Sequence, residues 1–143
     1  MSLTRLFGQW MTDGLQRFWG FSSFDFLIPV PLHTRRLRER GFNQALLLAA
    51  EISHKTGISC EKRLLLKIKP TVPQIHLSGG EREKEIKGAF RVVHEDRVQK
   101  KFILLIDDVF TTGATVNECS KVLLASGAQR VDVLTLAHAV KRI

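Results

Sequence analysis

The sequence has few cysteines and no long apolar run. Its two cysteines, Cys60 and Cys119, form no CxxC pair, and no secretory signal is recognisable. A disulfide framework or a zinc site therefore lacks support, and we expect both thiols to be small buried groups in a reducing cytoplasm. No stretch approaches the roughly 18 consecutive apolar residues that a membrane-spanning helix requires. A Walker A loop is also excluded, because no lysine follows Gly113.

The charge is unbalanced toward basic residues. Lys and Arg number 22 against 14 Asp and Glu, a formal net charge of +8, which favours anionic partners such as nucleic acid, polyphosphates or acidic proteins. The densest basic run contains Arg35, Arg36, Arg38 and Arg40, with Glu39 among them. We expect this run to be either a solvated helix face or loop, or a surface that contacts phosphate.

Residues 1–22 carry a pattern of their own. Apolar side chains recur there at spacings of three and four residues, which is typical of an amphipathic helix. They are Leu3, Leu6, Phe7, Trp10, Met11, Leu15, Phe18 and Trp19. We predict that this helix packs on the single globular domain formed by residues 23–143 or on a second copy of the chain, so that a homodimer is one expected arrangement. Few basic residues accompany the stripe, which disfavours a membrane surface.

The rest of the chain alternates apolar strands with helices. Strands are predicted at 24–30, 64–66, 90–93, 102–106 and 131–136, and helices at 43–55, 79–87 and 114–125. Asn43 and Gly57 are the expected cap and stop of the first of these helices, and Ser78 with Glu81 matches the S-x-x-E capping box. Short apolar strands separated by helices indicate an α/β fold, with a mostly parallel twisted sheet covered on both faces.

The segment LLIDDVFTTGATV carries the clearest chemical pattern. Asp107 and Asp108 follow a buried strand, and a turn then leads into a helix. The turn consists of Thr111, Thr112, Gly113, Ala114 and Thr115. Ligands of open α/β sheets bind at the carboxyl ends of the strands, and a helix N-terminus attracts phosphate. Carboxylates accept hydrogen bonds from sugar hydroxyls or hydrated magnesium, so the pattern predicts a sugar-phosphate site.

This string resembles the signature that binds phosphoribosyl pyrophosphate (PRPP) in type I phosphoribosyltransferases. Two further segments, PVPLHTRRLRERGFNQA at 29–45 and TVPQIHLSGGEREKEIKGAF at 71–90, resemble the ComF family of competence-associated proteins. Together the resemblance covers about residues 25–140. It implies the type I phosphoribosyltransferase fold, in which the segment 71–90 would be a flexible loop or hood that closes over the site.

The resemblance also implies a role for each matching residue. Asp107 and Asp108 would hold the ribose, and the turn 111–115 would hold the 5′-phosphate. The loop that would face pyrophosphate is Pro31, Leu32, His33 and Thr34. Arg35, Arg40 and Arg82 are candidate contacts of pyrophosphate or acceptor, and Gln74 and Arg82 match the flexible-loop pattern. Magnesium would arrive with PRPP rather than on dedicated protein ligands, and no catalytic residue is assigned, although His33 is the best-placed histidine.

As an enzyme, such a chain would transfer the phosphoribosyl group from PRPP to an unknown nitrogen acceptor and release pyrophosphate, in DNA uptake or nucleotide metabolism. The alternative is a non-catalytic competence component that senses PRPP or docks DNA or partner proteins, which the positive charge also fits. Lys67, Lys69 and Glu85 depart from the family pattern, which has arginines and an asparagine there, and this bears on the choice of acceptor.

Overall fold

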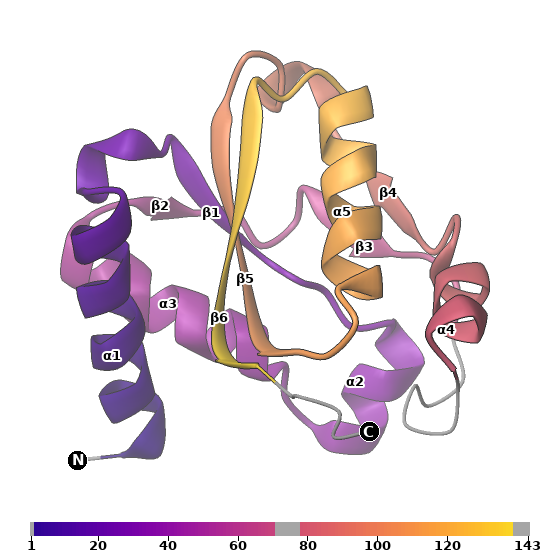
Figure 1. Cartoon of the computed structure of the whole chain (residues 1–143), viewed down its shortest axis with the longest axis horizontal. Coiled ribbons are helices and arrows are strands. Elements are labelled where there is room, and N and C mark those ends of the chain that lie inside the picture. The colour runs from indigo at the N-terminus through magenta and orange to yellow at the C-terminus, as the bar shows by residue number, and fades with distance from the viewer. Residues whose placement is uncertain (1, 71–77, 139–143) are drawn as a thin grey trace.

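The structure is a computed structural model that describes residues 2–70 and 78–138. Its centre is a parallel sheet of four strands in the order β2-β1-β5-β6 (Figure 1). These strands are β1 Phe26–Pro29, β2 Ser59–Cys60, β5 Phe102–Phe110 and β6 Arg130–His138. Two further strands form a separate antiparallel pair, β3 Leu65–Lys67 and β4 Phe90–Val92.

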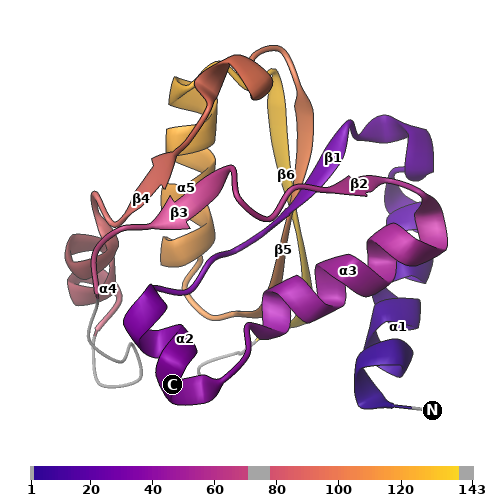
Figure 2. The ribbon, with the colours of Figure 1, turned by 180° about the vertical axis from the view of Figure 1, so that it is seen from behind.

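Helices cover both faces of the parallel sheet (Figures 1 and 2). The helices are α1 Leu3–Phe18, α2 Thr34–Arg40, α3 Gln44–Thr56, α4 Gly79–Ile86 and α5 Ala114–Ala125, with short 3-10 turns η1 Phe21–Ser23 and η3 Glu95–Arg97. One hydrophobic cluster joins α1 and α3 to the sheet, and another joins α5 and the β3–β4 pair to the opposite face. The predicted α/β fold with both faces covered is confirmed.

Strand β5 shows why the sheet is enclosed on both sides. Alternate residues of a strand point to opposite faces. Ile103 and Leu105 belong to the cluster beneath α5, whereas Leu104 and Ile106 belong to the cluster beneath α1 and α3. All four side chains are fully buried. A continuous apolar run of this kind is typical of a parallel strand between two helical layers.

The chain leaves the two central strands in opposite directions. From β1 it passes through α3 to β2 on one side of the sheet, and from β5 it passes through α5 to β6 on the other. Because both crossovers are expected to be right-handed, α3 and α5 lie on opposite faces. The carboxyl ends of β1 and β5 therefore flank a topological switch point, which is where open α/β sheets bind ligands.

The helix ends predicted from capping residues are confirmed. Asn43 caps α3, and Gly57 ends it in the left-handed conformation with φ 78°. The Ser78 side chain accepts a hydrogen bond from the Glu81 backbone and the Glu81 side chain accepts one from Ser78, so the capping box of α4 forms as predicted. These elements are fixed by contacts within three or four residues, which is why local sequence predicts them.

Strand boundaries differ more from the prediction. Strand β5 continues four residues beyond the predicted end at 106, because β6 goes on pairing with it as far as Phe110 and His138. The two-residue strand β2 was not predicted, and it is too short to carry a periodic signal. The segments predicted as strands at 64–66 and 90–93 do form strands, but they pair with each other outside the parallel sheet.

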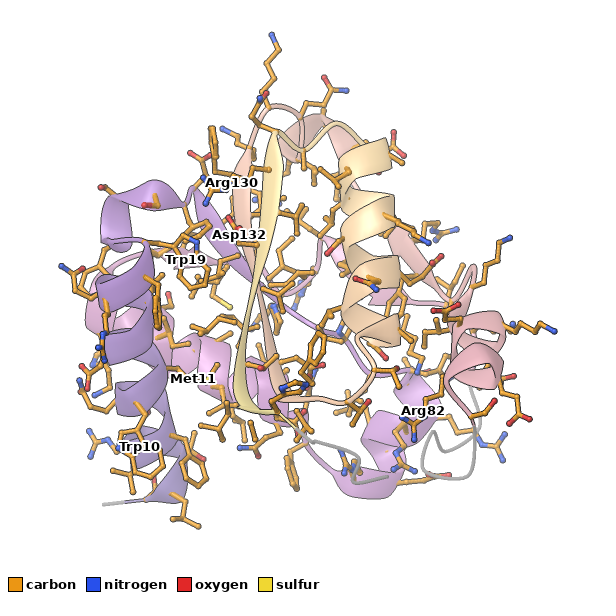
Figure 3. All side chains as sticks on the ribbon, in the orientation of Figure 1. Trp10, Met11, Trp19, Arg82, Arg130 and Asp132 are labelled. Atoms are coloured by element: carbon orange, nitrogen blue, oxygen red, sulfur yellow. The ribbon has the colours of Figure 1, made fainter. Side chains whose placement is uncertain are left out.

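Helix α1 buries only part of its apolar stripe. Met11 is buried against α3, and Gly8 allows the two helices to approach so closely that a Cβ at this glycine would lie 2.7 Å from the Glu51 Cβ. Trp10 and Phe18 remain 56% and 73% exposed. Figure 3 shows Trp10 on the outer side of α1. The described part of the chain contains no helix with the length and apolar character needed to cross a bilayer.

Candidate functional site

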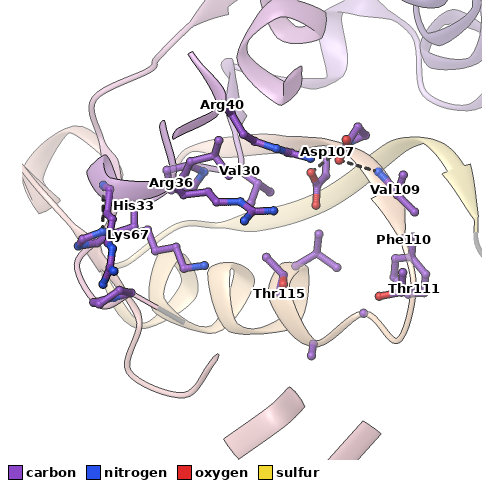
Figure 4. A pocket seen from close by; sticks show the side chains of 18 of the residues that line it. Val30, His33, Arg36, Arg40, Lys67, Asp107, Val109, Phe110, Thr111 and Thr115 are labelled. Carbon is purple, nitrogen blue, oxygen red and sulfur yellow. Dashed lines mark hydrogen bonds between the residues drawn. The ribbon is translucent and has the colours of Figure 1, made fainter. Parts of the chain in front are cut away.

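A cavity of about 590 Å³ lies at the switch point. Four segments line it: the loop after β1, helix α2, the end of β3 with the residues after it, and the stretch from the end of β5 through the turn to the start of α5 (Figure 4). The predicted site residues that line it are Pro31, Leu32, His33, Arg35, Arg40, Asp107, Asp108, Thr111, Gly113, Ala114 and Thr115. The fold thus brings together two motifs that are about 70 residues apart in the sequence.

The remaining predicted residues do not line this cavity in the described structure. Thr34 and Thr112 are sequence neighbours of lining residues, and Arg82 lies on α4, on the side of the molecule away from α1 (Figure 3). The Thr112 hydroxyl instead accepts the Ala114 backbone N–H at 3.3 Å and so braces the turn. Gln74 lies outside the described residues.

The two acidic residues are held by their local backbone. Asp107 Oδ1 accepts the Asp108 N–H at 2.9 Å, and Asp108 Oδ1 accepts the Val109 N–H at 2.9 Å. Burial raises the pKa of Asp107 to about 7; the side chain and negative charge of Asp108 act in the same direction, whereas the hydrogen bond from the Asp108 backbone N–H opposes them. Near neutral pH the Asp107 carboxyl is therefore protonated in some molecules and ionised in others. The protonated form can donate a hydrogen bond to a ligand hydroxyl, and either form can accept one.

Helix α5 begins at the cavity with a residue that has no side chain. Gly113 is its N-cap, in the left-handed conformation with φ 83°. A Cβ at Gly113 would lie 2.7 Å from the Phe110 Cζ, so the aromatic ring packs directly against this glycine. The Phe110 ring in turn contacts His138 of β6, with centroids 5.0 Å apart. Glycine is therefore required here, and the positive end of the α5 dipole faces the cavity.

Helix α2 supplies basic side chains on the other side. The sequence left open whether the arginine run forms a helix or a loop, and the structure shows a helix whose residues are all exposed. His33 caps it, because its Nδ1 accepts the Arg35 N–H at 3.2 Å. Arg36 and Arg40 extend from α2 into the cavity (Figure 4). Glu39 lies 3.9 Å from both Arg35 and Arg36, exposed ion pairs of small energetic value.

Several residues that line the cavity were not among the individually predicted site residues. They include Arg36, Glu39, Lys67, Val109 and Phe110. Arg36 and Glu39 were part of the recognised basic run, whereas Lys67 was noted only as a departure from the family pattern. Lys67 belongs to β3, in the separate antiparallel pair, so no local pattern indicates that it meets β5 and α2.

Comparison with known proteins places this site in context. No protein-family model matches the chain. The DNA utilization protein YhgH of Salmonella typhi is 39% identical over 114 residues, which cover 80% of this chain and 49% of that protein. Competence protein F of Haemophilus influenzae is 38% identical over 114 residues, with coverage of 79% and 50%. Competence protein ComFC of Streptococcus pneumoniae is 29% identical over 139 residues, with coverage of 95% and 56%. The chain thus spans about half the length of these curated relatives.

Solved structures agree on the architecture. An allosteric regulatory enzyme of purine biosynthesis matches with a TM-score of 0.61 at 22% identity, over 93% of this chain and 25% of that one. The purine phosphoribosyltransferase from Pyrococcus horikoshii matches with a TM-score of 0.57 at 15% identity, over 96% and 75%. At such identities the likeness shows the fold. The chain is therefore a homologue of competence proteins F and ComFC that has the type I phosphoribosyltransferase fold.

Proposed function

We propose that the cavity binds PRPP with its magnesium and that the chain transfers the phosphoribosyl group to a nitrogen acceptor. The observation that carries this proposal is the meeting of the Asp107 and Asp108 carboxylates with the N-terminus of α5 in a single cavity. A carboxylate pair repels a phosphate but accepts hydrogen bonds from hydroxyls, whereas a helix N-terminus attracts a phosphate. A ribose 5-phosphate satisfies both parts at once.

The other parts of PRPP follow from this orientation. With the 5′-phosphate on the turn 111–115 and the ribose hydroxyls on the aspartates, the pyrophosphate extends toward the loop after β1 and helix α2. Arg35 and Arg40 line that side of the cavity. Cations there compensate the negative charge that builds up on the leaving group.

The reaction is a displacement at the anomeric carbon of the ribose. The bond from this carbon to the pyrophosphate oxygen breaks, its electron pair leaves with the pyrophosphate, and the acceptor nitrogen forms the new bond and releases its proton to the solvent. Magnesium carried with PRPP would neutralise part of the pyrophosphate charge. The residues of this chain hold the ribose and phosphate in place, and positioning of this kind lowers the barrier without a covalent intermediate.

Isothermal titration with PRPP and magnesium tests the proposal. The wild-type chain should bind saturably, and the Asp107→Asn/Asp108→Asn variant should bind about 100-fold more weakly, because amides replace both hydroxyl-binding carboxyl groups. The matched control is Asp13→Asn/Asp96→Asn, which changes two exposed aspartates that do not line the cavity. Equal binding by the two double variants, or no binding by a folded wild-type chain, would refute the proposal. Release of pyrophosphate then serves as the readout in a screen of nitrogen acceptors.

A second candidate function is the docking of DNA. All residues of α2 are exposed, and the Arg35 side chain is 78% exposed, so the helix presents a basic surface as well as a cavity wall. Binding through such a surface would weaken steeply with salt. Arg38→Glu distinguishes the two functions, because Arg38 does not line the cavity. A DNA-docking chain would lose affinity for a short duplex in this variant, while PRPP binding would be unchanged.

A further inference from the structure

Helix α1 presents two rows of side chains, and the described part of the domain covers one of them. The buried row consists of Gly8, Met11, Thr12 and Leu15. The other row, which we call the outer row, consists of Leu3, Phe7, Trp10, Gly14 and Phe18. These positions are three or four residues apart, so at 3.6 residues per turn they share one side of the helix. Leu3, Trp10 and Phe18 are 67%, 56% and 73% exposed.

The outer row is held in place by contacts within the chain. Phe7 packs against the hydrophobic cluster that joins α1 and α3 to the sheet, and its ring centroid lies 5.5 Å from that of Trp10. The Arg17 guanidinium lies 5.9 Å from the centre of the Phe18 ring. Rigid aromatic side chains lose little conformational freedom on binding, and exposed apolar rows of this kind mark interaction surfaces.

The outer row is complementary to an antiparallel copy of itself. In a pair of α1 helices centred between Trp10 and Met11, Leu3 lies opposite the second copy's Phe18, and Phe7 lies opposite the second copy's Gly14. The two-fold symmetry repeats both contacts. A Cβ added at Gly14 would meet no atom of its own chain within 4 Å, so open space lies above this glycine. A large side chain facing a small one allows two helices to interdigitate.

The charge distribution favours this occupant over an anionic one. The whole chain carries a net charge of +8, which makes two copies repel each other over most of their surfaces. Helix α1 contains only Arg5, Arg17 and Asp13 as charged residues, and the outer row contains none. Nucleic acid and anionic membranes bind to basic surfaces, which the outer row does not offer. A second uncharged apolar row does match it.

The exposed area suits a weak dimer. At roughly 200 Å² per aromatic side chain, Trp10 and Phe18 with exposed fractions of 56% and 73% would together bury on the order of 500 Å² in two copies. Leu3, Phe7 and the polar rim add to this area and bring the total toward the roughly 1,200 Å² of a small specific interface. We therefore expect a dissociation constant on the order of 10 μM.

We propose that the chain forms a homodimer through the outer row of α1, with the two α1 helices packed antiparallel about a two-fold axis. Among the described residues that line the candidate cavity, none belongs to α1, so this inference is independent of the proposed function. It assigns a partner to the part of the aromatic stripe that the domain leaves uncovered.

Sedimentation velocity of the full chain, from about 1 to about 100 μM, tests the dimer. The mass of the wild-type chain should rise from that of one copy to that of two. Trp10→Gln/Phe18→Gln should raise the dissociation constant about 100-fold or more, because the aromatic anchors of the interface are lost. The matched control is Leu124→Gln, which removes a 49% exposed leucine from α5 and should dimerise like the wild type.

Gly14→Leu separates a specific antiparallel dimer from general stickiness. The added side chain improves helix propensity and meets open space in its own chain, so the variant should fold. It fills the space that receives Phe7 of the second copy and should weaken the dimer about 10-fold or more, whereas non-specific association should strengthen with the added apolar surface. Thermal unfolding checks that each variant is folded, and Gly14→Leu keeps the test decisive if the double variant is not.

Three outcomes would overturn the proposal. A wild-type chain that stays monomeric up to about 100 μM would show that a second copy does not cover α1. A dimer that survives Trp10→Gln/Phe18→Gln would place the interface elsewhere on the molecule. Stronger association by Gly14→Leu would exclude the antiparallel packing of the two outer rows.

Discussion

The two central strands of the sheet, β1 and β5, are connected to their neighbours by α3 and α5, and these two helices begin differently. At α3 the Asn43 Oδ1 accepts the N–H groups of Ala45 and Leu46 at 3.0 and 3.4 Å, so a side chain already satisfies the first turn. At α5 the N-cap is Gly113, which has no side chain, and it lines the cavity. A capped N-terminus stabilises its helix, whereas an N-terminus capped by glycine leaves room for an external anion. The contrast supports placing the proposed phosphate site on the β5–α5 unit.

The β1 unit contributes to the site in another way. Between β1 and α3 the chain inserts the short helix α2, which carries the arginines of the cavity wall. Asn43 also links this unit to the site, because its Nδ2 donates to the Val30 carbonyl at 3.2 Å, and Val30 lines the cavity. One unit thus supplies a helix N-terminus and carboxylates, and the other supplies cations.

The two units should differ most in how their acidic residues affect stability, and the largest effect that we expect is on the pH dependence of the unfolding free energy. The pKa of Asp107 is raised to about 7 from an ordinary value of 3.8, so between these values the folded state binds more protons than the unfolded state. Stability is therefore lost as pH rises from about 4 to about 7 and stays at the lower level above that. Asp107→Asn removes the penalty and should raise the free energy of unfolding at pH 8 by about 2–4 kcal/mol, in urea titrations.

The gain should shrink toward zero near pH 4, where Asp107 is protonated in both states. Asp96→Asn, an exposed aspartate in η3, is the matched control and should follow the wild-type curve. If the Asp107→Asn and wild-type stabilities stayed parallel from pH 4 to 8, burial would not be governing the ionisation of this carboxyl. The same variant should bind PRPP more weakly, so stability and binding would change in opposite directions.

A smaller effect is expected from replacing the glycine that starts α5. Gly113→Ala introduces a Cβ at positive φ and 2.7 Å from the Phe110 ring, and we expect a loss of about 2 kcal/mol in unfolding free energy and weaker PRPP binding. Gly57→Ala at the end of α3 is the control, because its φ is 78° but no atom lies within 4 Å of the added Cβ. It should cost about 1 kcal/mol and leave binding unchanged. Similar losses in both variants would argue against the Phe110 contact.

The smallest effect concerns the cap of α3. Asn43→Ala removes the hydrogen bonds to the α3 N-terminus and to Val30 and should lower the unfolding free energy by about 1 kcal/mol. Its effect on ribose 5-phosphate affinity should be less than about twofold, because the proposed phosphate turn is on the other unit. A large loss of affinity, measured by titration at a temperature where the variant is fully folded, would show that the β1 unit also positions that turn.

Much of the local architecture could be predicted from the sequence. Helix ends are set by contacts within a few residues, at Asn43 and Gly57 for α3 and at the Ser78–Glu81 capping box for α4. The apolar run in β5 indicates a strand enclosed on both faces, and the order of strands and helices indicates an α/β sheet. The turn 111–115 was likewise recognisable, because a glycine between threonines at a helix start indicates a turn in which the backbone needs a positive φ.

Other features depended on distant parts of the chain. The length of β5 follows from pairing with β6, and the pairing of β3 with β4 separates two strands from the main sheet. The aromatic stripe of α1 is only partly covered, because α3 meets α1 at Gly8 and leaves Trp10 outside the contact. Periodicity indicates which helix is amphipathic, but it does not tell how wide the covering surface is.

The sequence was sufficient for most of the elements, the sheet type and the two motifs at the carboxyl ends of β1 and β5, because capping, alternation and turn chemistry act between near neighbours. The tertiary structure was needed to bring Lys67 and Arg36 into one cavity and to bury Asp107 until its pKa rises to about 7. Those properties arise from desolvation and charge across packed elements. Their strength depends on distances in space that no spacing along the chain encodes.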